Sequence, residues 1–480
     1  MGNRTHLVDK YSVALLLILV LLLIRFFSLS ALPLYDTTEA RYAEIARIMF
    51  ETNNWVTPMI DYEKPFWGKP PFHTWLSASG FMVFGVSEFG ARIPHFACGL
   101  ITLFLVFRFV KEMNDEKSAV LAVLVLASSI GFIVGMGMVM TDIALLLSTS
   151  VAMISFWKTY ADSSDKFYGL IFFASLALGM LVKGPVAIVL VAISLGVWSI
   201  WQGQLIKALT CLPWLTGVSL FALLTLPWYL MAEYRTPGFL EYFIIGEHFQ
   251  RFIVSGWEGD LYGSAHDQPR GTIWIYWLVA AFPWSFVLIT SFIQRMLVAT
   301  SETRCSPSGF NAYLICWMIA PMLLFTLSGN ILSAYVLPGF SAMSILIALT
   351  CQFQIRHLTA AALTVVLLAT LLGIYLTGNV SKSSELHLLG RNSTTFESTP
   401  LYYWQHRPFS AQYYSNGNAK LLANTHELQQ VIDAQGDFFL AIEDKHLTLI
   451  KTPHLKGNCT EILSSNIRQL LFCKGDREKR

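Results

Sequence analysis

Two carboxylates that directly follow an apolar run, Asp36 and Glu39, are the first candidates for chemistry in this sequence. Residues 11–32 before them contain a single charged side chain. With a spacing of three, both carboxylates can face one way on a helical turn. A carboxyl group at an apolar boundary has a raised pKa, which suits a general base. Helix capping by Asp36 or a following threonine, with Glu39 in the first turn, explains the same residues without catalysis.

Lysines in the same part of the chain and beyond it could hold a phosphate. Lys69 lies in the segment GKPP, where two prolines fix the backbone after it and tryptophans lie nearby on both sides. Lys183, in LVKGPVA, lies at the outer end of a later apolar run. Both could equally be interfacial lysines that extend their ammonium groups to lipid headgroups without binding a substrate.

A second charged stretch, residues 231–271, adds further candidates. His248 and Arg251 are three apart and so share a helical face, and His266 and Arg270 follow them. A histidine and a carboxylate could hold a metal ion, yet the stretch has no close ligand pattern such as H-x-x-x-H. Arginine forks match the oxygens of a phosphate. The stretch therefore favours phosphate recognition.

The composition indicates where such a site can lie. Of the 480 residues, 54% are hydrophobic and 13% are charged, whereas soluble domains carry roughly 25% charge. The chain is therefore predicted to be an integral membrane protein. Its net charge of +2, without a basic helix or an aromatic–basic motif, argues against nucleic acid as a partner.

Apolar runs separated by polar breaks predict a polytopic α-helical protein with about eleven transmembrane helices. The first run has no small-residue cleavage signature at its end and is interpreted as a retained signal anchor. The stretch Phe72–Val86 is short for a crossing and is predicted to lie along the interface. The predicted spans are residues 11–32, 93–110, 118–138, 141–157, 167–182, 185–201, 211–230, 272–293, 311–327, 332–350 and 358–377.

The basic residues predict the sidedness of this membrane domain, residues 1–378. Two outer loops, residues 33–92 and 231–271, carry charge whereas other outer connections are nearly free of it. Their charge predicts one composite site at the outer membrane surface. With a cytoplasmic N-terminus, lysine and arginine lie in the inner connections, which are residues 108–117, 158–166, 202–210, 294–310 and 351–357.

The composition changes again in the last part of the chain. Residues 379–480 are polar and are predicted to form a small α/β domain on the outer, periplasmic side. Residues 437–443 and 447–452 have the pattern of short strands. Residues 425–434 have the pattern of a helix with Thr425 as its N-cap.

Two of the seven cysteines, Cys459 and Cys473, belong to this predicted outer domain. Disulfides form in oxidising compartments, so these two residues are predicted to pair. The other cysteines lie in or beside apolar runs or, for Cys305, in a basic loop, and the chain has no C-x-x-C metal spacing.

Seven short motifs follow one another in a recognisable order. They read DTTEARYAEIARIM, NWVTP, FWGKPP, SEFGARIP, LVKGP, EHFQRF and AHDQPRGTIWIY. With these motifs the chain resembles the C-type glycosyltransferase superfamily, in the branch of protein mannosyltransferases and lipid A aminoarabinose transferases. The resemblance covers roughly residues 30–340.

The resemblance implies an inverting membrane enzyme that takes a sugar from a polyprenyl (undecaprenyl) phosphate carrier. Such enzymes pass the sugar to an acceptor at the outer face of the cell inner membrane, and lipid A or another envelope glycolipid is the expected acceptor. A protein O-glycosyltransferase of the mannosyltransferase type is the alternative. A transporter of lipid-linked sugars is a third hypothesis, but transporters place ionisable groups near the bilayer midplane, whereas this chain gathers its charges at one face.

One departure from the family concerns the base. Relatives usually read Asp-Glu-x-Arg-Tyr, and this chain has Thr38 in the place of the aspartate. A threonine cannot take up a proton near neutral pH, so Asp36, the nearest other carboxylate, is predicted to activate the acceptor. Glu39, held ionised by Arg41, is predicted to shape the site. The predicted ligands of the carrier and the sugar are Arg41, Tyr42, Lys69, Lys183, His248, Arg251, His266 and Arg270.

A second departure concerns a metal ion. Aminoarabinose transferases have a glutamate before the lysine of the GKPP segment, where this chain has Gly68 before Lys69. The resemblance implies that this glutamate holds a divalent metal together with a second-loop histidine, which His266 matches. With Gly68 in that place one ligand of this metal site is missing, although Glu63 could replace it.

Overall fold

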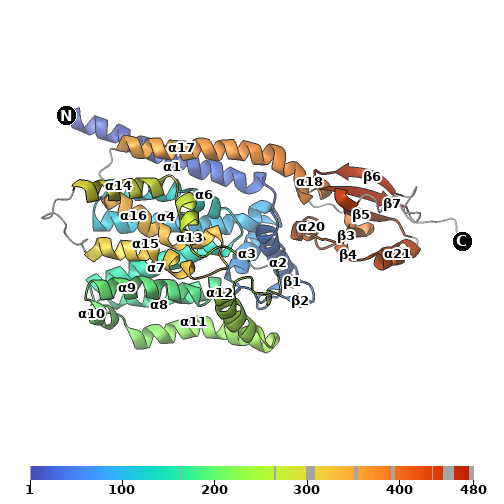
Figure 1. Cartoon of the computed structure of the whole chain (residues 1–480), viewed down its shortest axis with the longest axis horizontal. Helices are drawn as coiled ribbons and strands as arrows, with labels where there is room; N and C mark the ends of the chain where they lie inside the picture. Colours follow the sequence, from blue (N-terminus) through green and yellow to red (C-terminus); the bar gives the residue numbers. More distant parts are fainter. Residues whose placement is uncertain are drawn as a thin grey trace.

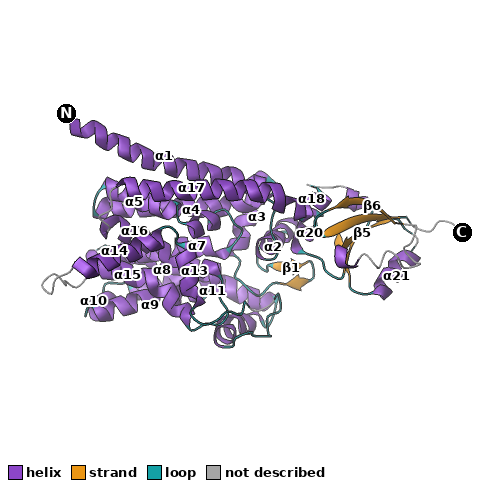
Figure 2. Cartoon of the chain, turned by 45° about the horizontal axis from the view of Figure 1, so that its top comes forward, coloured by secondary structure: helices purple, strands orange, loops and turns teal. Residues whose placement is uncertain are grey.

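The computed structural model describes residues 2–163, 165–263, 266–298, 309–350, 355–390, 395–434, 436–446 and 459–474. Long helices lie roughly parallel to one another in one bundle, and a small sheet lies beyond one end of it (Figure 1). The strands are confined to that end of the molecule (Figure 2). The predicted polytopic helical fold with a small C-terminal sheet region is confirmed.

Eight of the described helical segments are long and apolar enough to cross a membrane. A ninth crossing results if α13 (Thr272–Ala280) and α14 (Trp284–Val298) form one span. These two helices meet at a bend of 104°, where Pro283 has no backbone N–H to continue a helix. The eight are α1 (Gly2–Ala31), α4 (Glu88–Met113), α7 (Thr141–Ala161), α8 (Lys166–Lys183), α11 (Trp214–Arg235, preceded by the short α10, Leu205–Thr210), α15 (Gly309–Thr326), η2 with α16 (Ser333–Gly339, Phe340–Thr350), and α17 (Ile355–Tyr375) with η3 (Leu376–Val380) and η4 (Ser381–Ser383).

The predicted count of about eleven spans is not confirmed, although each predicted run contains helix. Residues 118–138 fall into two short helices, α5 (Glu116–Ala127) and α6 (Ile130–Gly135). They are separated by two serines whose hydroxyls bond to carbonyls of the preceding turn. The run 185–201 forms α9 (Val186–Trp201), which is short for a crossing. The apolar pattern predicted where helices form but not where they break.

The two charged loops fold into short elements at the same end of the bundle (Figure 1). The first loop contains α2 (Thr38–Thr52), β1 (Met59–Asp61), β2 (Lys64–Pro65) and α3 (Phe72–Phe84), and the second contains η1 (Glu241–Gln250) and α12 (Arg251–Ile253). Helix α3 occupies the predicted interfacial stretch and packs closely against α4. Gly80 permits this contact, because a Cβ there would lie 2.0 Å from the carbonyl oxygen of Gly90.

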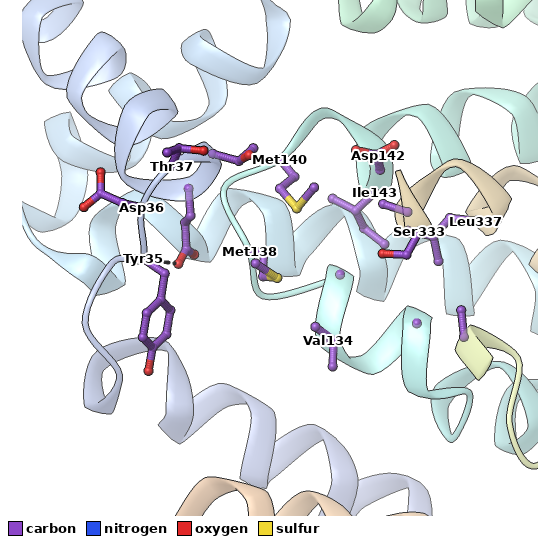
Figure 3. A pocket seen from close by; sticks show the side chains of 16 residues that line it. Tyr35, Asp36, Thr37, Val134, Met138, Met140, Asp142, Ile143, Ser333 and Leu337 are labelled. Carbon is purple, nitrogen blue, oxygen red and sulfur yellow. Dashed lines mark hydrogen bonds between the residues drawn. The ribbon is translucent and has the colours of Figure 1, made fainter. Parts of the chain in front are cut away.

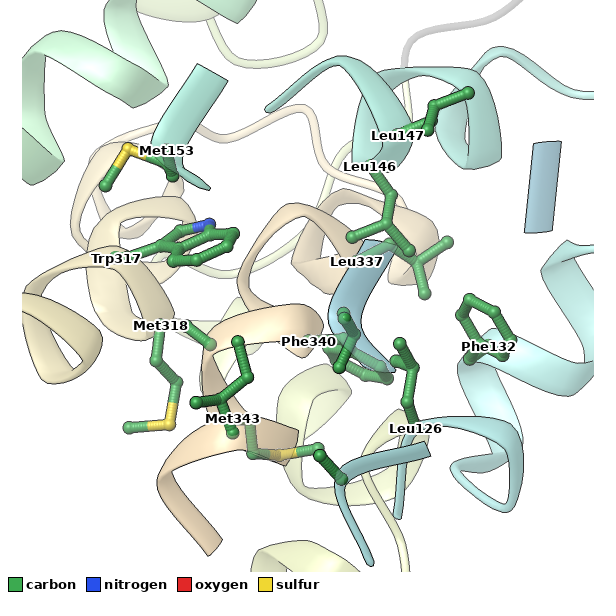
Figure 4. Packing of buried hydrophobic residues seen from close by; sticks show 14 of the residues in the cluster. Leu126, Phe132, Leu146, Leu147, Met153, Trp317, Met318, Leu337, Phe340 and Met343 are labelled. Atoms are coloured by element: carbon green, nitrogen blue, oxygen red, sulfur yellow. The ribbon is translucent and has the colours of Figure 1, made fainter. Parts of the chain in front are cut away.

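One large apolar core holds the bundle together (Figure 4). Phe132 of α6, Leu337 of η2, Phe340 of α16 and Trp317 of α15 are buried in it. The indole Nε1 of Trp317 donates to the carbonyl of Pro338 (3.0 Å), so the one polar atom of this side chain is satisfied. This packing fixes η2 in the bundle.

The C-terminal domain contains a five-stranded sheet. Its elements are α18 (Glu385–Leu389), α19 (Thr395–Ser398), β3 (Leu401–Trp404), α20 (Phe409–Tyr414), β4 (Ala419–Leu422), α21 (Thr425–Asp433), β5 (Phe438–Glu443), β6 (Cys459–Ser464) and β7 (Arg468–Cys473). The strand order is β4-β3-β5-β7-β6, with β3 parallel to β4 and β5, and β7 antiparallel to β5 and β6. Cys459 and Cys473 form a disulfide that joins β6 to β7.

The local predictions for this domain have mixed outcomes. The predicted strand 437–443 is β5, whereas residues 447–452 lie outside the described residues. The predicted helix is α21, but Thr425 is its first residue and not its N-cap. The cap is Asn424, whose side chain accepts a backbone hydrogen bond from the first turn at 3.0 Å.

Helices α1 and α17 pack side by side, and both lead toward the C-terminal domain (Figure 1). The two charged loops lie at the same end. The three segments that the sequence assigns to the outer side are thus gathered at one end of the bundle. Which end faces the cytoplasm stays a prediction from the basic residues.

Candidate active site

Asp36 lies in the turn before α2, and its carboxylate faces the C-terminal domain. Oδ1 accepts hydrogen bonds from the backbone N–H groups of Phe409 (2.9 Å) and Ser410 (3.2 Å), and Oδ2 accepts one from the Ser410 hydroxyl. Asp36 thereby caps α20, whose first N–H groups have no partner inside the helix. Figure 3 shows its carboxylate turned away from Asp142. Both carboxylate oxygens of Asp36 are therefore engaged by the C-terminal domain.

Glu39 is buried, with 2% of its surface exposed, and is held by a partner from α4. Its two carboxylate oxygens accept charge-assisted hydrogen bonds of 2.8 Å from Nε and Nη2 of Arg92. Burial by itself would raise the pKa of Glu39, but the charge and hydrogen bonds of Arg92 outweigh it and lower this pKa. The prediction that Arg41 holds Glu39 ionised is therefore wrong about the partner. Arg92 lies in the SEFGARIP motif at the start of α4.

Arg41 instead connects the two loops. Its Nη1 donates to the carbonyl oxygen of Tyr262 (2.8 Å), and its guanidinium lies over the rings of Tyr42 (5.3 Å) and Phe66 (5.8 Å). Phe66 in turn packs edge-on against the ring of Tyr262, with centroids 4.8 Å apart. Arg41 and Tyr42 therefore lie where the first loop meets the second, as the prediction of one composite site requires.

Lys69 and Arg251, from different loops, converge on one carboxylate of the second loop that is not among the predicted ligands. Glu247 accepts a hydrogen bond from Lys69 Nζ (3.0 Å) and two from Arg251 Nη1 (2.9 and 3.1 Å). Burial alone would raise the pKa of Glu247, but the charges of Lys69 and Arg251 outweigh it and lower this pKa. Asp260 approaches the same guanidinium nitrogen at 3.3 Å. The i, i+4 spacing of Glu247 and Arg251 was the available sequence signal.

Two cavities meet at this ion cluster of Lys69, Glu247 and Arg251, which lines both. The polar cavity, of about 210 Å³, is otherwise lined by residues of both loops and one residue of the C-terminal domain: Thr37, Arg41, Tyr42, Phe66, Gly68, Asp260, Tyr262, Gly263, His266 and Phe409. The apolar cavity, of about 240 Å³, is otherwise lined by residues of the bundle and of the second loop: Lys183, Pro185, Val186, Val189, His248, Phe252, Leu324, Phe325, Ser328, Asn330 and Tyr335.

Lys183 is buried at the end of α8 and pairs with a second carboxylate that the sequence did not single out. Its Nζ donates to Asp142 Oδ1 (2.6 Å) and lies 4.1 Å from the ring centre of Tyr335. His248 lies close by, with one ring nitrogen 2.8 Å from the carbonyl oxygen of Phe243 and the other 3.0 Å from that of Lys183. His248 therefore anchors the backbone of the second loop to α8. Asp142 is the first acidic residue of α7, and a lone carboxylate opening an apolar run was its only sequence signal.

A third cavity, of about 320 Å³, lies between the start of the first loop and α6, α7 and η2 (Figure 3). Asp36, Thr38, Glu39 and Asp142 are among its lining residues, and Thr37 lines both it and the polar cavity. Because Asp142 is paired with Lys183, the ion pair separates this third cavity from the apolar one. These three cavities therefore surround the ion cluster of Lys69, Glu247 and Arg251 and the ion pair of Asp142 and Lys183.

The remaining predicted ligands, His266 and Arg270, lie in different environments. His266 lines the polar cavity, where burial and the nearby cation Arg251 lower its pKa and favour the neutral ring. Arg270 is exposed and lines none of the three cavities in the described part of the chain. The prediction for Arg270 is therefore not supported by its position, although it lies only four residues after His266.

The residues present do not fit a divalent metal. Gly68 offers no side-chain ligand, and a Cβ there would lie 2.9 Å from the ring of Phe66. Glu63, the suggested replacement, is exposed in the turn between β1 and β2 and is absent from the lining of the polar cavity. Within the described ranges, no group of three or more His, Cys, Asp or Glu side chains is arranged to hold a metal ion.

A helical membrane bundle whose two charged loops enclose paired charges agrees with the predicted resemblance to the C-type glycosyltransferase superfamily, and the comparisons with known proteins point the same way. Residues 9–243 match the family described as dolichyl-phosphate-mannose-protein mannosyltransferase.

Among similar proteins is the undecaprenyl phosphate-α-4-amino-4-deoxy-L-arabinose arabinosyl transferase of Erwinia tasmaniensis. It is 30% identical over 322 residues, which are 66% of this chain and 55% of the relative. The enzyme of the same name from Shewanella sediminis is 29% identical over 71% of this chain and 60% of its own length. The chain thus spans little more than half the length of these relatives.

Solved structures show the same fold. The crystal structure of ArnT from Cupriavidus metallidurans bound to undecaprenyl phosphate superposes with a TM-score of 0.77 at 18% identity, covering 95% of this chain and 97% of that one. The archaeal oligosaccharyltransferase AglB from Archaeoglobus fulgidus gives a TM-score of 0.53 at 13% identity, over 92% and 70% of the two chains. At these identities the likeness concerns the fold alone.

Proposed function

We propose that the chain transfers a sugar from a polyprenyl phosphate carrier to an acceptor at the outer face of the inner membrane. One observation carries the proposal. The cations Lys69 and Arg251 lie in the wall shared by an apolar cavity and a polar cavity. A lipid-linked sugar is an amphiphile with a hydrocarbon tail, a phosphate and a polar head in that order. The succession of apolar cavity, cations and polar cavity matches this order.

The carrier phosphate is assigned to Lys69 and Arg251, with Lys183 close to the tail side. Of the three N–H groups of the Lys69 ammonium, the described contacts use two, to Gly68 O (2.6 Å) and Glu247 (3.0 Å), which leaves a donor for a phosphate oxygen. The described contacts of Arg251 use Nη1, so its other nitrogens can donate as well. Glu247 keeps both cations in place, and such preorganised donors stabilise the charge that builds on a departing phosphate.

The base is assigned to Asp142. Both Asp36 and Asp142 line the third cavity, but the oxygens of Asp36 are taken up by the C-terminal domain. Asp142 has one oxygen on Lys183, while its other oxygen has only a long contact of 3.4 Å from the Thr141 hydroxyl among the described residues. The sequence predicted this role for Asp36. The geometry favours Asp142 because its second oxygen has room for a hydrogen bond from the acceptor hydroxyl.

The reaction then proceeds in one displacement. The hydroxyl proton of the acceptor passes to Asp142 as the acceptor oxygen forms a bond to the anomeric carbon of the sugar. The bond from that carbon to the phosphate oxygen breaks, and its electron pair leaves with the polyprenyl phosphate anion, which Lys69 and Arg251 receive. Attack from the face opposite the leaving group inverts the anomeric centre.

The relatives support a particular class of substrate. The two transferases described above, from Erwinia tasmaniensis and Shewanella sediminis, are named for undecaprenyl phosphate and 4-amino-4-deoxy-L-arabinose. We therefore propose undecaprenyl phosphate as the carrier and an envelope glycolipid such as lipid A as the acceptor. The matching family description favours a second candidate, transfer to a protein hydroxyl.

A reconstitution experiment tests the proposal. The purified chain in liposomes is given undecaprenyl phosphate-4-amino-4-deoxy-L-arabinose together with lipid A or with a serine-rich protein. Formation of glycosylated lipid A and free undecaprenyl phosphate is expected. Transfer only to the protein would favour the second candidate. Movement of the intact donor across the bilayer without transfer would identify a transporter and refute the proposal.

A further inference from the structure

The C-terminal domain is seated directly on the first outer loop. Besides the contacts of Asp36 with α20, the Tyr414 hydroxyl accepts a hydrogen bond from the Leu34 N–H (2.8 Å) and donates one to Glu88 (3.2 Å). Leu34, Ala43 and Met49 of the first loop share one buried apolar cluster with Ala411 and Tyr413 of α20. The domain and the loop therefore form one packed unit.

A further ion pair joins the domain and the loop away from the cavities. Arg407 Nη2 donates to Asp61 Oδ2 at 2.7 Å, and Arg407 Nη1 donates to the carbonyl oxygen of Ala419. Neither Arg407 nor Asp61 lines the polar cavity. This pair therefore offers a matched control, because it contributes to domain contact without touching the site.

The first residue of α20 reaches the polar cavity. Phe409 lines this cavity together with Arg41, Lys69 and His266. The other cavity residues all come from the two outer loops, so Phe409 is the contribution of the described C-terminal domain. An aromatic ring presents an apolar face, and a sugar ring in a polar cavity needs such a face for its C–H groups as well as polar partners for its hydroxyls.

We propose that Phe409 contacts the transferred sugar and that Asp36 is the positioning residue that fixes it. The inference rests on the proposed function, since it places the sugar in the polar cavity beside the carrier phosphate. Asp36 binds the N–H groups of Phe409 and Ser410, so it determines where the Phe409 side chain begins. The C-terminal domain is then a wall of the active site, and an acidic residue of the first loop attaches it there.

A binding experiment with two probes tests the role of Phe409. Undecaprenyl phosphate measures the carrier site alone, and undecaprenyl phosphate-4-amino-4-deoxy-L-arabinose adds the sugar. Phe409→Ala is expected to weaken binding of the sugar-bearing probe roughly three- to tenfold, the range of an aromatic contact, with no change for the bare carrier. Phe409→Tyr should keep wild-type affinity for both. Equal affinities of wild type and Phe409→Ala for the sugar-bearing probe would overturn the inference.

A second measurement tests the role of Asp36. Asp36→Ala should reproduce the sugar-specific loss and increase hydrogen exchange at the amides of Phe409 and Ser410, while the pH dependence of transfer keeps its wild-type shape. Arg407→Ala, which weakens the domain contact elsewhere, should leave both probes bound normally. A loss in Arg407→Ala equal to that in Asp36→Ala would reduce Asp36 to a general docking contact and overturn its assignment.

The two proposals fail in different ways. If the wild-type chain binds neither probe, the proposed function fails. If the wild type binds both and transfers the sugar, while Phe409→Ala is normal, the proposed function stands and only the role of the C-terminal domain is wrong.

Discussion

Replacing each of two carboxylates by its amide distinguishes the base from the residue that attaches the C-terminal domain. Asp142→Asn keeps the shape of the side chain, but the neutral amide cannot take up the proton in the proposed transfer. Loss of a general base typically costs 10²–10⁴-fold in rate, and we expect that loss in kcat. Asp36→Asn should cost less than about tenfold, because the amide oxygen can still accept the Phe409 N–H bond, one contact of modest net worth.

The structure also sets a control for Asp142→Asn. Asp142 is buried and is the ion-pair partner of Lys183 at 2.6 Å, so the variant leaves a buried cation without its counter-charge. Removing one member of such a pair destabilises a protein by about 3–5 kcal/mol. The double variant Asp142→Asn, Lys183→Met removes both charges and should regain most of that stability. If it remains inactive at a wild-type melting temperature, unfolding does not explain the loss of transfer.

The assay is single-turnover transfer from the lipid-linked sugar, measured from about pH 5 to 10 in liposomes. In Asp142→Asn the residual rate should rise with pH, because hydroxide partly replaces the missing base. Asp36→Asn should show the wild-type profile. The opposite result, with Asp36→Asn inactive and Asp142→Asn near normal, would refute the assignment and restore the prediction made from the sequence.

Four further outcomes are expected. Lys69→Ala should reduce transfer about 10²-fold or more by removing a preorganised phosphate donor, and a near-normal rate would make Lys69 an interfacial lysine. Glu39→Gln should lower unfolding stability by about 3–5 kcal/mol because Arg92 stays buried; since the folded pKa of Glu39 is lowered, its contribution exists above the unfolded pKa and is lost as pH falls through the folded value. The double variant Cys459→Ser, Cys473→Ser should destabilise the C-terminal domain by about 3 kcal/mol in the chain-entropy model, measured by thermal unfolding. Reporter fusions near residues 300 and 400 should report opposite sides of the membrane.

The sequence predicted the parts of the site that depend on local pattern. Apolar runs located the helices, and the positive-inside rule assigned the two charged loops and the C-terminal domain to one side. The structure brings these three segments together at one end of the bundle (Figure 1). Lys69, Lys183 and Arg251, which the sequence predicted as phosphate ligands, all line the cavities there.

Partnerships over long sequence separations could not be predicted in this way. The pairs Glu39–Arg92 and Asp36–Ser410 join residues 53 and 374 positions apart, and no local periodicity links them. Arg41 was the obvious partner for Glu39 because it is two residues away. On a helix, however, residues two apart point in different directions, so the side chain of Arg41 is directed at the second loop instead.

The contacts of Asp36 also explain why it need not act as the base, although it lies only two residues before Thr38, the usual position of the base. Thr38 begins α2 and lines the third cavity, while Asp36 precedes the helix and bonds to α20. A base must reach the acceptor hydroxyl within hydrogen-bond distance, and this requirement concerns position in space more than position in sequence. Asp142, which is more than a hundred residues further along the chain, lines the same cavity as Thr38 and has an oxygen to accept the proton. Asp36 instead connects the membrane domain to the C-terminal domain through its contacts with Phe409 and Ser410, and Phe409 lines the polar cavity.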